Sequence, residues 1–232
     1  MKIQCVWEHN GDDSILYSAN FVGAFTRGKS KDEAVRKMPS EILSYLAWKG
    51  DAPPDALEPE IVQEKASAIT VSDADSDVLF NDEKAPLTAA EYEALKSLAM
   101  KSARDFLALY RSIPDKDKSA LPPRATFYGE IPRTAREMYN HTKNVNTYYG
   151  VQADNSGTIA ECRERGFALL ERQRDFLENQ VFLGSYDEEW SLRKVLRRFI
   201  WHDRIHAKAM YRMALKTFGT GAVPNIFFFP DK

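Results

Sequence analysis

The stretch SLRKVLRRFIWHDRIHAKAMYRMALKTFG, residues 191–219, decides how the second half of the chain folds. Apolar and histidine side chains recur along it at alternating steps of three and four residues, namely Leu192, Val195, Phe199, His202, His206, Ala209 and Met213. That spacing is typical of the buried stripe of one α-helix. Gly219 is well suited to end such a helix. We therefore expect one long helix whose inward face carries two histidines.

A third histidine lies on a similar stripe earlier in the chain, which reads Thr134, Met138, His141, Val145 and Tyr148. Burying polar side chains without partners costs a few kcal/mol each. His202 and His206 are one helical turn apart, about 6 Å along the axis, so both rings can reach one ion. We expect His141, His202 and His206 to bind one metal ion. The alternative is that they are core histidines hydrogen-bonded to carbonyl groups, tyrosines or water.

Three neutral imidazoles leave a tetrahedral ion with one open position, which favours chemistry over a purely structural role. A water there would become a better nucleophile, and a substrate thiol would bind as its thiolate. Imidazole ligands suit zinc, nickel, iron or copper, so the ion is a divalent transition metal that sequence does not choose. Glu137 and Asp203 are close enough in sequence to orient the rings, or are plain surface charges.

Length and composition set broad limits. The 232 residues, 44% hydrophobic and 28% charged, suit one large domain or two small ones. No apolar run approaches the roughly 20 residues that span a bilayer, so no membrane association is expected. The N-terminus lacks the apolar core of a signal peptide. Cys5 and Cys162 form no disulfide or zinc-finger pattern, and a cytoplasmic location is predicted.

The charge pattern supports two domains, because residues 1–87 carry a net charge of −7 and residues 88–232 carry +5. Short strand-like segments dominate residues 1–70, and residues 71–87 read as a linker. Residues 88–232 contain four capping-box starts followed by amphipathic stretches, the third running from about 158 to 180. The predicted fold class is α+β, with a small N-terminal α/β domain followed by an antiparallel four-helix bundle and an apolar C-terminal tail.

Two surfaces carry further expectations. The last helix is rich in basic residues, which are Arg193, Lys194, Arg197, Arg198, Arg204, Lys208, Arg212 and Lys216. We expect them to form a solvated outer face, and a pI near 6.1 gives no support to a nucleic-acid partner. The tail around Phe227-Phe228-Phe229 is expected to pack onto the protein or onto a second subunit.

Residues 88–218 resemble the DinB superfamily of four-helix bundles, which includes damage-inducible and thiol-transferase-like proteins. The resemblance rests on RTAREMYNH at 133–141 with Tyr148-Tyr149, and on WSLR at 190–193 leading to HDRIH at 202–206. In that family one histidine of the second helix and an HxxxH pair of the last helix bind a divalent metal. The resemblance thus implies His141, His202 and His206 as ligands, a homodimer, and a small thiol such as bacillithiol or mycothiol as substrate.

Residues 1–50 are similar to the small HicB-type domain, through Phe21–Ala34 with its strand, turn and helix. In HicB proteins this fold often serves protein partnering. The function expected from both halves is a metal-dependent enzyme that activates water or a small thiol, of the thiol-transferase or hydrolase class. The alternative is a non-catalytic binding or regulatory module with a structural metal and an N-terminal partner-binding domain.

Overall fold

The computed structural model describes residues 1–11, 13–71, 75–126, 129–148 and 155–230. The described residues divide into two compact units. Unit 1 comprises Met1–Ala89, Leu177–Trp201 and Phe228–Lys232, and unit 2 comprises Ala90–Phe176 and His202–Phe227. Both units are therefore built from segments that are separated in sequence, and the last helix contributes to each of them.

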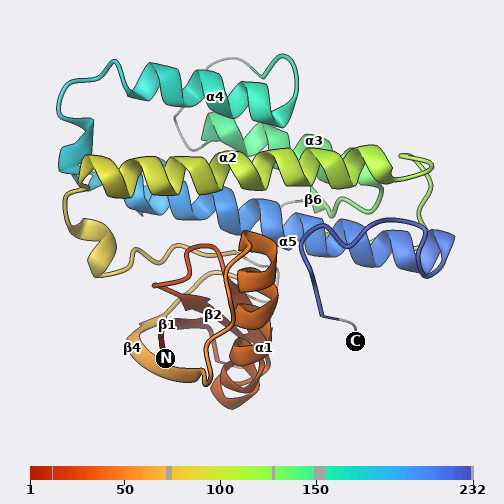
Figure 1. The fold of residues 1–232 in the computed structure, drawn as a ribbon, viewed down its shortest axis with the longest axis horizontal. Coiled ribbons are helices and arrows are strands. Elements are labelled where there is room, and N and C mark those ends of the chain that lie inside the picture. The colour runs from red at the N-terminus through yellow and green to blue at the C-terminus, as the bar shows by residue number, and fades with distance from the viewer. Residues whose placement is uncertain (12, 72–74, 127–128, 149–154, 231–232) are drawn as a thin grey trace. The chain divides into compact units, whose positions relative to one another are not determined.

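Unit 1 contains a mixed four-stranded sheet in the order β3-β2-β1-β4. Its strands are β1 (Lys2–His9), β2 (Ser14–Ser18), β3 (Phe25–Gly28) and β4 (Glu58–Ala66). Figure 1 labels β1, β2 and β4 of this sheet. β1 pairs antiparallel with β2 and parallel with β4. The parallel pair requires a crossover, which helix α1 (Lys31–Lys49) supplies. The side chain of Ser30 caps the start of α1, and Gly50 ends it with a φ of 87°.

The remainder of unit 1 is made of short elements and the beginning of helix α5 (Leu192–Phe218). The short elements are η2 (Asp82–Lys84), η3 (Phe176–Glu178), β7 (Phe182–Leu183), η4 (Ser185–Asp187) and β8 (Glu189–Trp190), with Phe176 itself assigned to unit 2. Leu196, Phe199 and Ile200 of α5 are fully buried. This part of the helix is buried on nearly every side.

Four of the basic residues of α5 are buried, which contradicts the expectation of a solvated face for them, whereas Arg212 and Lys216 are exposed as expected. Lys194 and Arg204 are 0% exposed, Arg197 is 2% exposed and Arg198 is 7% exposed. The Arg197 guanidinium donates to Glu83 Oε1 at 2.5 Å and to Oε2 at 3.0 Å. The Lys194 ammonium donates to backbone oxygens of Asp77 and Glu189. Because Asp77 and Glu83 come from a distant segment, helical periodicity could not reveal these contacts.

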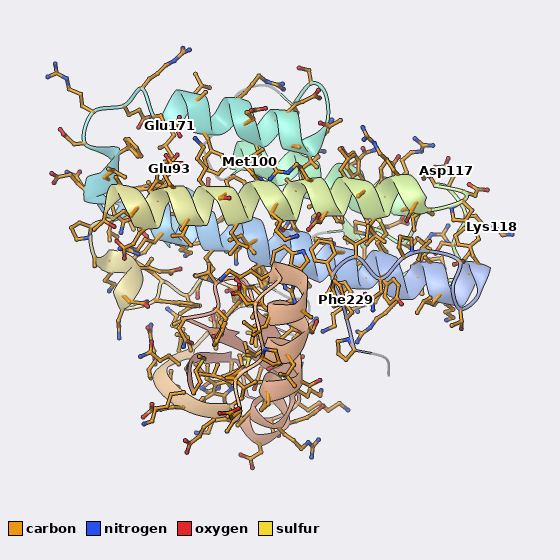
Figure 2. The ribbon with its side chains drawn as sticks, viewed as in Figure 1. Glu93, Met100, Asp117, Lys118, Glu171 and Phe229 are labelled. Carbon is orange, nitrogen blue, oxygen red and sulfur yellow. The ribbon has the colours of Figure 1, made fainter. Side chains whose placement is uncertain are left out.

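Unit 2 consists of α2 (Ala89–Ser112) except its first residue, α3 (Ala135–Tyr148), α4 (Ile159–Leu170) and the second part of α5, with the short pair β5 (Ala125–Thr126) and β6 (Gly129–Glu130). Helices α2, α3 and α4 lie side by side in Figure 1. The Tyr139 ring of α3 stacks on Tyr110 of α2 with centroids 4.2 Å apart. Glu171, labelled in Figure 2, accepts a hydrogen bond of 3.0 Å from the Tyr92 hydroxyl and joins the end of α4 to α2.

The apolar tail packs onto the protein's own chain. Phe227 is 0% exposed within unit 2, where the Arg204 guanidinium lies 6.0 Å from its ring centroid. Phe229, labelled in Figure 2, is 4% exposed. The buried tail residues therefore give no support to a homodimer. The homodimer stays a prediction.

The predicted antiparallel four-helix bundle is wrong. The third helix was expected to reach residue 180 but α4 ends at Leu170, and the chain then turns through Asp175 and Asn179, both with positive φ, into short 3₁₀ and strand segments. The first ten residues of α5 belong to unit 1 rather than to a bundle. The fold is instead an α+β arrangement of a mixed four-stranded sheet and five α-helices within the described residues.

Candidate metal centre

Helix α5 positions two of the three candidate ligands. His202 and His206 follow each other by one turn, and their Nε2 atoms lie 3.1 Å apart. His202 is 8% exposed and His206 is partly buried. The ring centroids are 4.4 Å apart. One helical turn of α5 therefore sets the spacing of His202 and His206, whatever the position of the third histidine.

Helix α3 brings the third histidine. Its start is fixed by a capping box, in which the Glu137 backbone N–H donates to Thr134 Oγ1 at 3.2 Å and the Glu137 carboxylate accepts from the Thr134 N–H at 3.0 Å. His141 follows one turn later, and its side chain is exposed. His141 is therefore more exposed than the buried stripe predicted, although its ring lies beside those of His202 and His206.

The three histidines converge as the sequence predicted. The His141 ring centroid lies 5.2 Å from that of His202 and 4.7 Å from that of His206. One ligand nitrogen from each ring can be chosen so that all three lie within 4.8 Å of one another. Nitrogen atoms bound tetrahedrally at about 2.0–2.1 Å from one ion are separated by about 3.3 Å, so small ring rotations would bring all three to one ion. The cluster could hold a metal ion.

The protonation states favour coordination. Burial, followed by the neighbouring charge of His141, lowers the pKa of His206 to about 3. Burial also lowers the pKa of His141. Both imidazoles are therefore neutral at pH 7, which is the form that binds a metal. Of the three side chains, that of His141 is exposed, that of His202 is buried and that of His206 is intermediate.

Glu137 and Asp203, the two candidates for orienting the rings, have other partners. The Glu137 carboxylate accepts from the backbone N–H groups of Arg133 and Thr134, which also holds its pKa below the usual value. The Asp203 carboxylate is 0% exposed and receives the guanidinium of Arg163, with the Arg163 Nη1 to Oδ2 distance at 2.5 Å and the Nη2 to Oδ1 distance at 3.0 Å. Glu137 is thus an exposed carboxylate that caps α3, whereas Asp203 is a buried ion-pair partner.

Arg163 is the residue that sequence reasoning missed. The buried stripe of α4 comprises Ile159, Cys162, Arg163, Gly166 and Phe167, at the spacing of one helix face. An arginine on such a stripe is itself a signal, because an arginine is almost never fully buried unless it is paired. The same spacing rule that singled out the histidines could have found it.

His9, the fourth histidine, stacks on Trp7 in unit 1 with ring centroids 3.9 Å apart, and its Nε2 lies 3.3 Å from Glu64 Oε1. Tyr149 of the aromatic pair that follows α3 falls outside the described residues. Among the described residues no helix combines the length and the apolar character needed to cross a membrane.

Comparison of the chain with protein-family models, with curated proteins and with solved structures gives no match to any of them. The site therefore has to be interpreted from its own geometry.

Proposed function

We propose that the protein binds one divalent transition-metal ion through His141, His202 and His206, and that it is a metal-dependent enzyme of the DinB type. The observation that carries this proposal is the convergence of three imidazoles from two helices within 4.8 Å. Zinc, nickel and iron are the candidate ions, since all accept imidazole ligands. The small-molecule substrate we propose is a low-molecular-weight thiol, or a compound hydrolysed by water.

The chain's own groups support an open rather than a closed site. His202 and His206 form a preset pair on α5, while the side chain of His141 on α3 is exposed. Three protein ligands leave room for a fourth, exchangeable one. A divalent ion bound there would act as a Lewis acid and lower the pKa of a water or thiol at the free position.

Metal binding is tested first, by elemental analysis of the gently purified protein. About one equivalent of divalent metal is expected, and zinc added to the metal-free protein should bind with the same stoichiometry. His202→Ala and His206→Ala should each weaken metal binding strongly. His141→Ala should leave a two-histidine site, formed by His202 and His206, that binds the metal more weakly. His9→Ala is the matched control, because it removes a histidine of unit 1. Equal affinity in all four variants would refute the assignment.

The open position is tested with cobalt(II) as a spectroscopic replacement. A tetrahedral site should give intense visible absorption, and addition of 2-mercaptoethanol should change that spectrum if a thiol enters the fourth position. An unchanged spectrum with the metal still bound would contradict thiol binding. It would favour the alternative, a regulatory module with a structural metal and a partner-binding, HicB-like N-terminal segment.

A further inference from the structure

We propose that Arg163 and Asp203 are positioning residues of the metal site, which fix α5 against α4 so that His141 meets His202 and His206. This inference rests on the proposed function, because it concerns the same metal site. The ion pair of Arg163 and Asp203 is called the latch below. Neither residue is a proposed metal ligand.

The latch is completely buried and makes directional contacts. Both Arg163 and Asp203 have side chains that are 0% exposed. The guanidinium makes two hydrogen bonds to the carboxylate and a third, from Nη1, of 2.9 Å to the backbone oxygen of Ala99 on α2. Charge-assisted paired bonds of this kind hold two groups in one geometry. Arg163 therefore ties α2, α4 and α5 together at the level of His202.

Hydrogen bonds to the start of α4 hold α3 in place. The Tyr139 hydroxyl of α3 accepts a 3.0 Å hydrogen bond from the backbone N–H of Ile159, the first residue of α4. The Lys143 ammonium donates to the backbone oxygens of Asn155 and Gly157, just before α4. Tyr139 and Lys143 lie two residues before and two residues after His141 on α3. α3 is thus attached to α4 where the third ligand lies.

A short series of contacts therefore connects His141 to His202. His141 is two residues from Tyr139, Tyr139 binds the start of α4, Arg163 lies one turn further along α4, and Asp203 directly follows His202 on α5. A rotation of α5 by one residue would turn the ligand pair by about 100° away from α3. The spacing between His202 and His206 needs no latch, because one helix sets it. The latch is needed only for the third ligand.

The experiment therefore compares the effect of the latch on zinc affinity with and without His141. The double variant Arg163→Met with Asp203→Leu replaces the buried pair by apolar side chains of similar size, which usually preserves folding. Its zinc affinity is measured by competition with a chromogenic chelator, both with all three histidines and in the His141→Ala background. We expect affinity to fall by on the order of tenfold or more with three histidines. In the His141→Ala background the remaining affinity should stay within about twofold, because both remaining ligands are on α5.

Helix α5 offers a matched control. Arg197 and Glu83 form a comparable buried pair in unit 1, with side-chain exposures of 2% and 7%. The double variant Arg197→Met with Glu83→Leu removes a buried ion pair from the same helix without touching unit 2. Its zinc affinity should equal that of the wild type. Far-UV circular dichroism establishes that each variant is folded before titration.

Three outcomes would overturn the positioning role: wild-type affinity in the latch variant, an equal loss in the His141→Ala background, or an equal loss in the control pair. Should the double latch variant not fold, Asp203→Asn, which keeps the side-chain shape, is judged by the same criteria. A wild-type protein that binds no metal would overturn the proposed function and the latch together. A wild-type protein that binds zinc, with a latch variant of equal affinity, would overturn the latch alone.

Discussion

Acidification of the metal-free protein from pH 7 to pH 5 should destabilise unit 2 by about 2 kcal/mol through His206. The folded-state pKa of this histidine is lowered to about 3, first by burial and then by the charge of His141. In the unfolded chain it titrates near pH 6.5. Between these values the unfolded state holds a proton that the folded state lacks. Stability is therefore complete above about pH 6.5 and is lost progressively as the pH falls toward 3.

The magnitude follows from proton linkage. At pH 7 about a quarter of unfolded molecules carry the proton on His206, and at pH 5 nearly all do. The folded state remains unprotonated throughout, because pH 5 still lies about two units above its pKa. The difference in unfolding free energy between the two pH values is then about 2 kcal/mol, close to the two-unit limit of 2.7 kcal/mol set by roughly 1.36 kcal/mol per unit.

The assay must report on unit 2. All four tryptophans, Trp7, Trp48, Trp190 and Trp201, belong to unit 1, and Trp201 directly precedes His202, so tryptophan fluorescence does not separate unit 2 from unit 1. Backbone amide exchange of α3 and α4, measured with a chelator present, gives local opening free energies at both pH values. His206→Gln should remove most of the pH dependence, and His9→Gln should not. Parallel losses in the wild type and in His206→Gln would refute the reasoning.

Three further predictions concern the rest of the molecule. Gly23→Ala should destabilise unit 1 by more than Gly11→Ala, since a Cβ at Gly23 would clash with Ile200 Cγ2, whereas Gly11 has a similar φ and nothing within 4 Å. Chemical denaturation of both variants, followed by tryptophan fluorescence, checks this, and equal losses would contradict it. Phe227→Ala should cost about 3–5 kcal/mol and Phe228→Ala, at a 55% exposed position, far less, as thermal or urea unfolding monitored by circular dichroism would show. The buried Cys5 thiol, whose pKa burial raises to about 11, should react with a thiol reagent at pH 8 only after unfolding, and rapid labelling of the native chain would contradict its placement.

Much of the candidate site could be predicted because its elements are local. The i, i+4 spacing of His202 and His206 determines their separation once residues 192–218 form a helix. The capping boxes at Thr134 and Thr158 were visible as sequence patterns and form as expected. Apolar spacing also identified Met138 and Phe199 as buried. Each of these features depends on residues within one or two turns of each other.

The errors have a common physical origin. Helical spacing says which side chains share a face, but it does not say what packs against the other faces. Lys194 and Arg197 look solvated in sequence, and they are buried because carboxylates and carbonyl oxygens from remote segments satisfy them. The predicted bundle failed for the same reason, since the first part of α5 is enclosed on nearly all sides within unit 1.

The sequence by itself determined the ligand pair on α5, the chemistry of three imidazoles and the start of α3, because backbone geometry and side-chain type set these over a few residues. Only the tertiary structure decided that His141, with its exposed side chain, lies beside that pair and that Asp203 is bound by Arg163, 40 residues away in the chain. Such contacts depend on how α3, α4 and α5 pack together. Packing is a property of surfaces that meet across long sequence separations, so spacing along a single helix does not encode it.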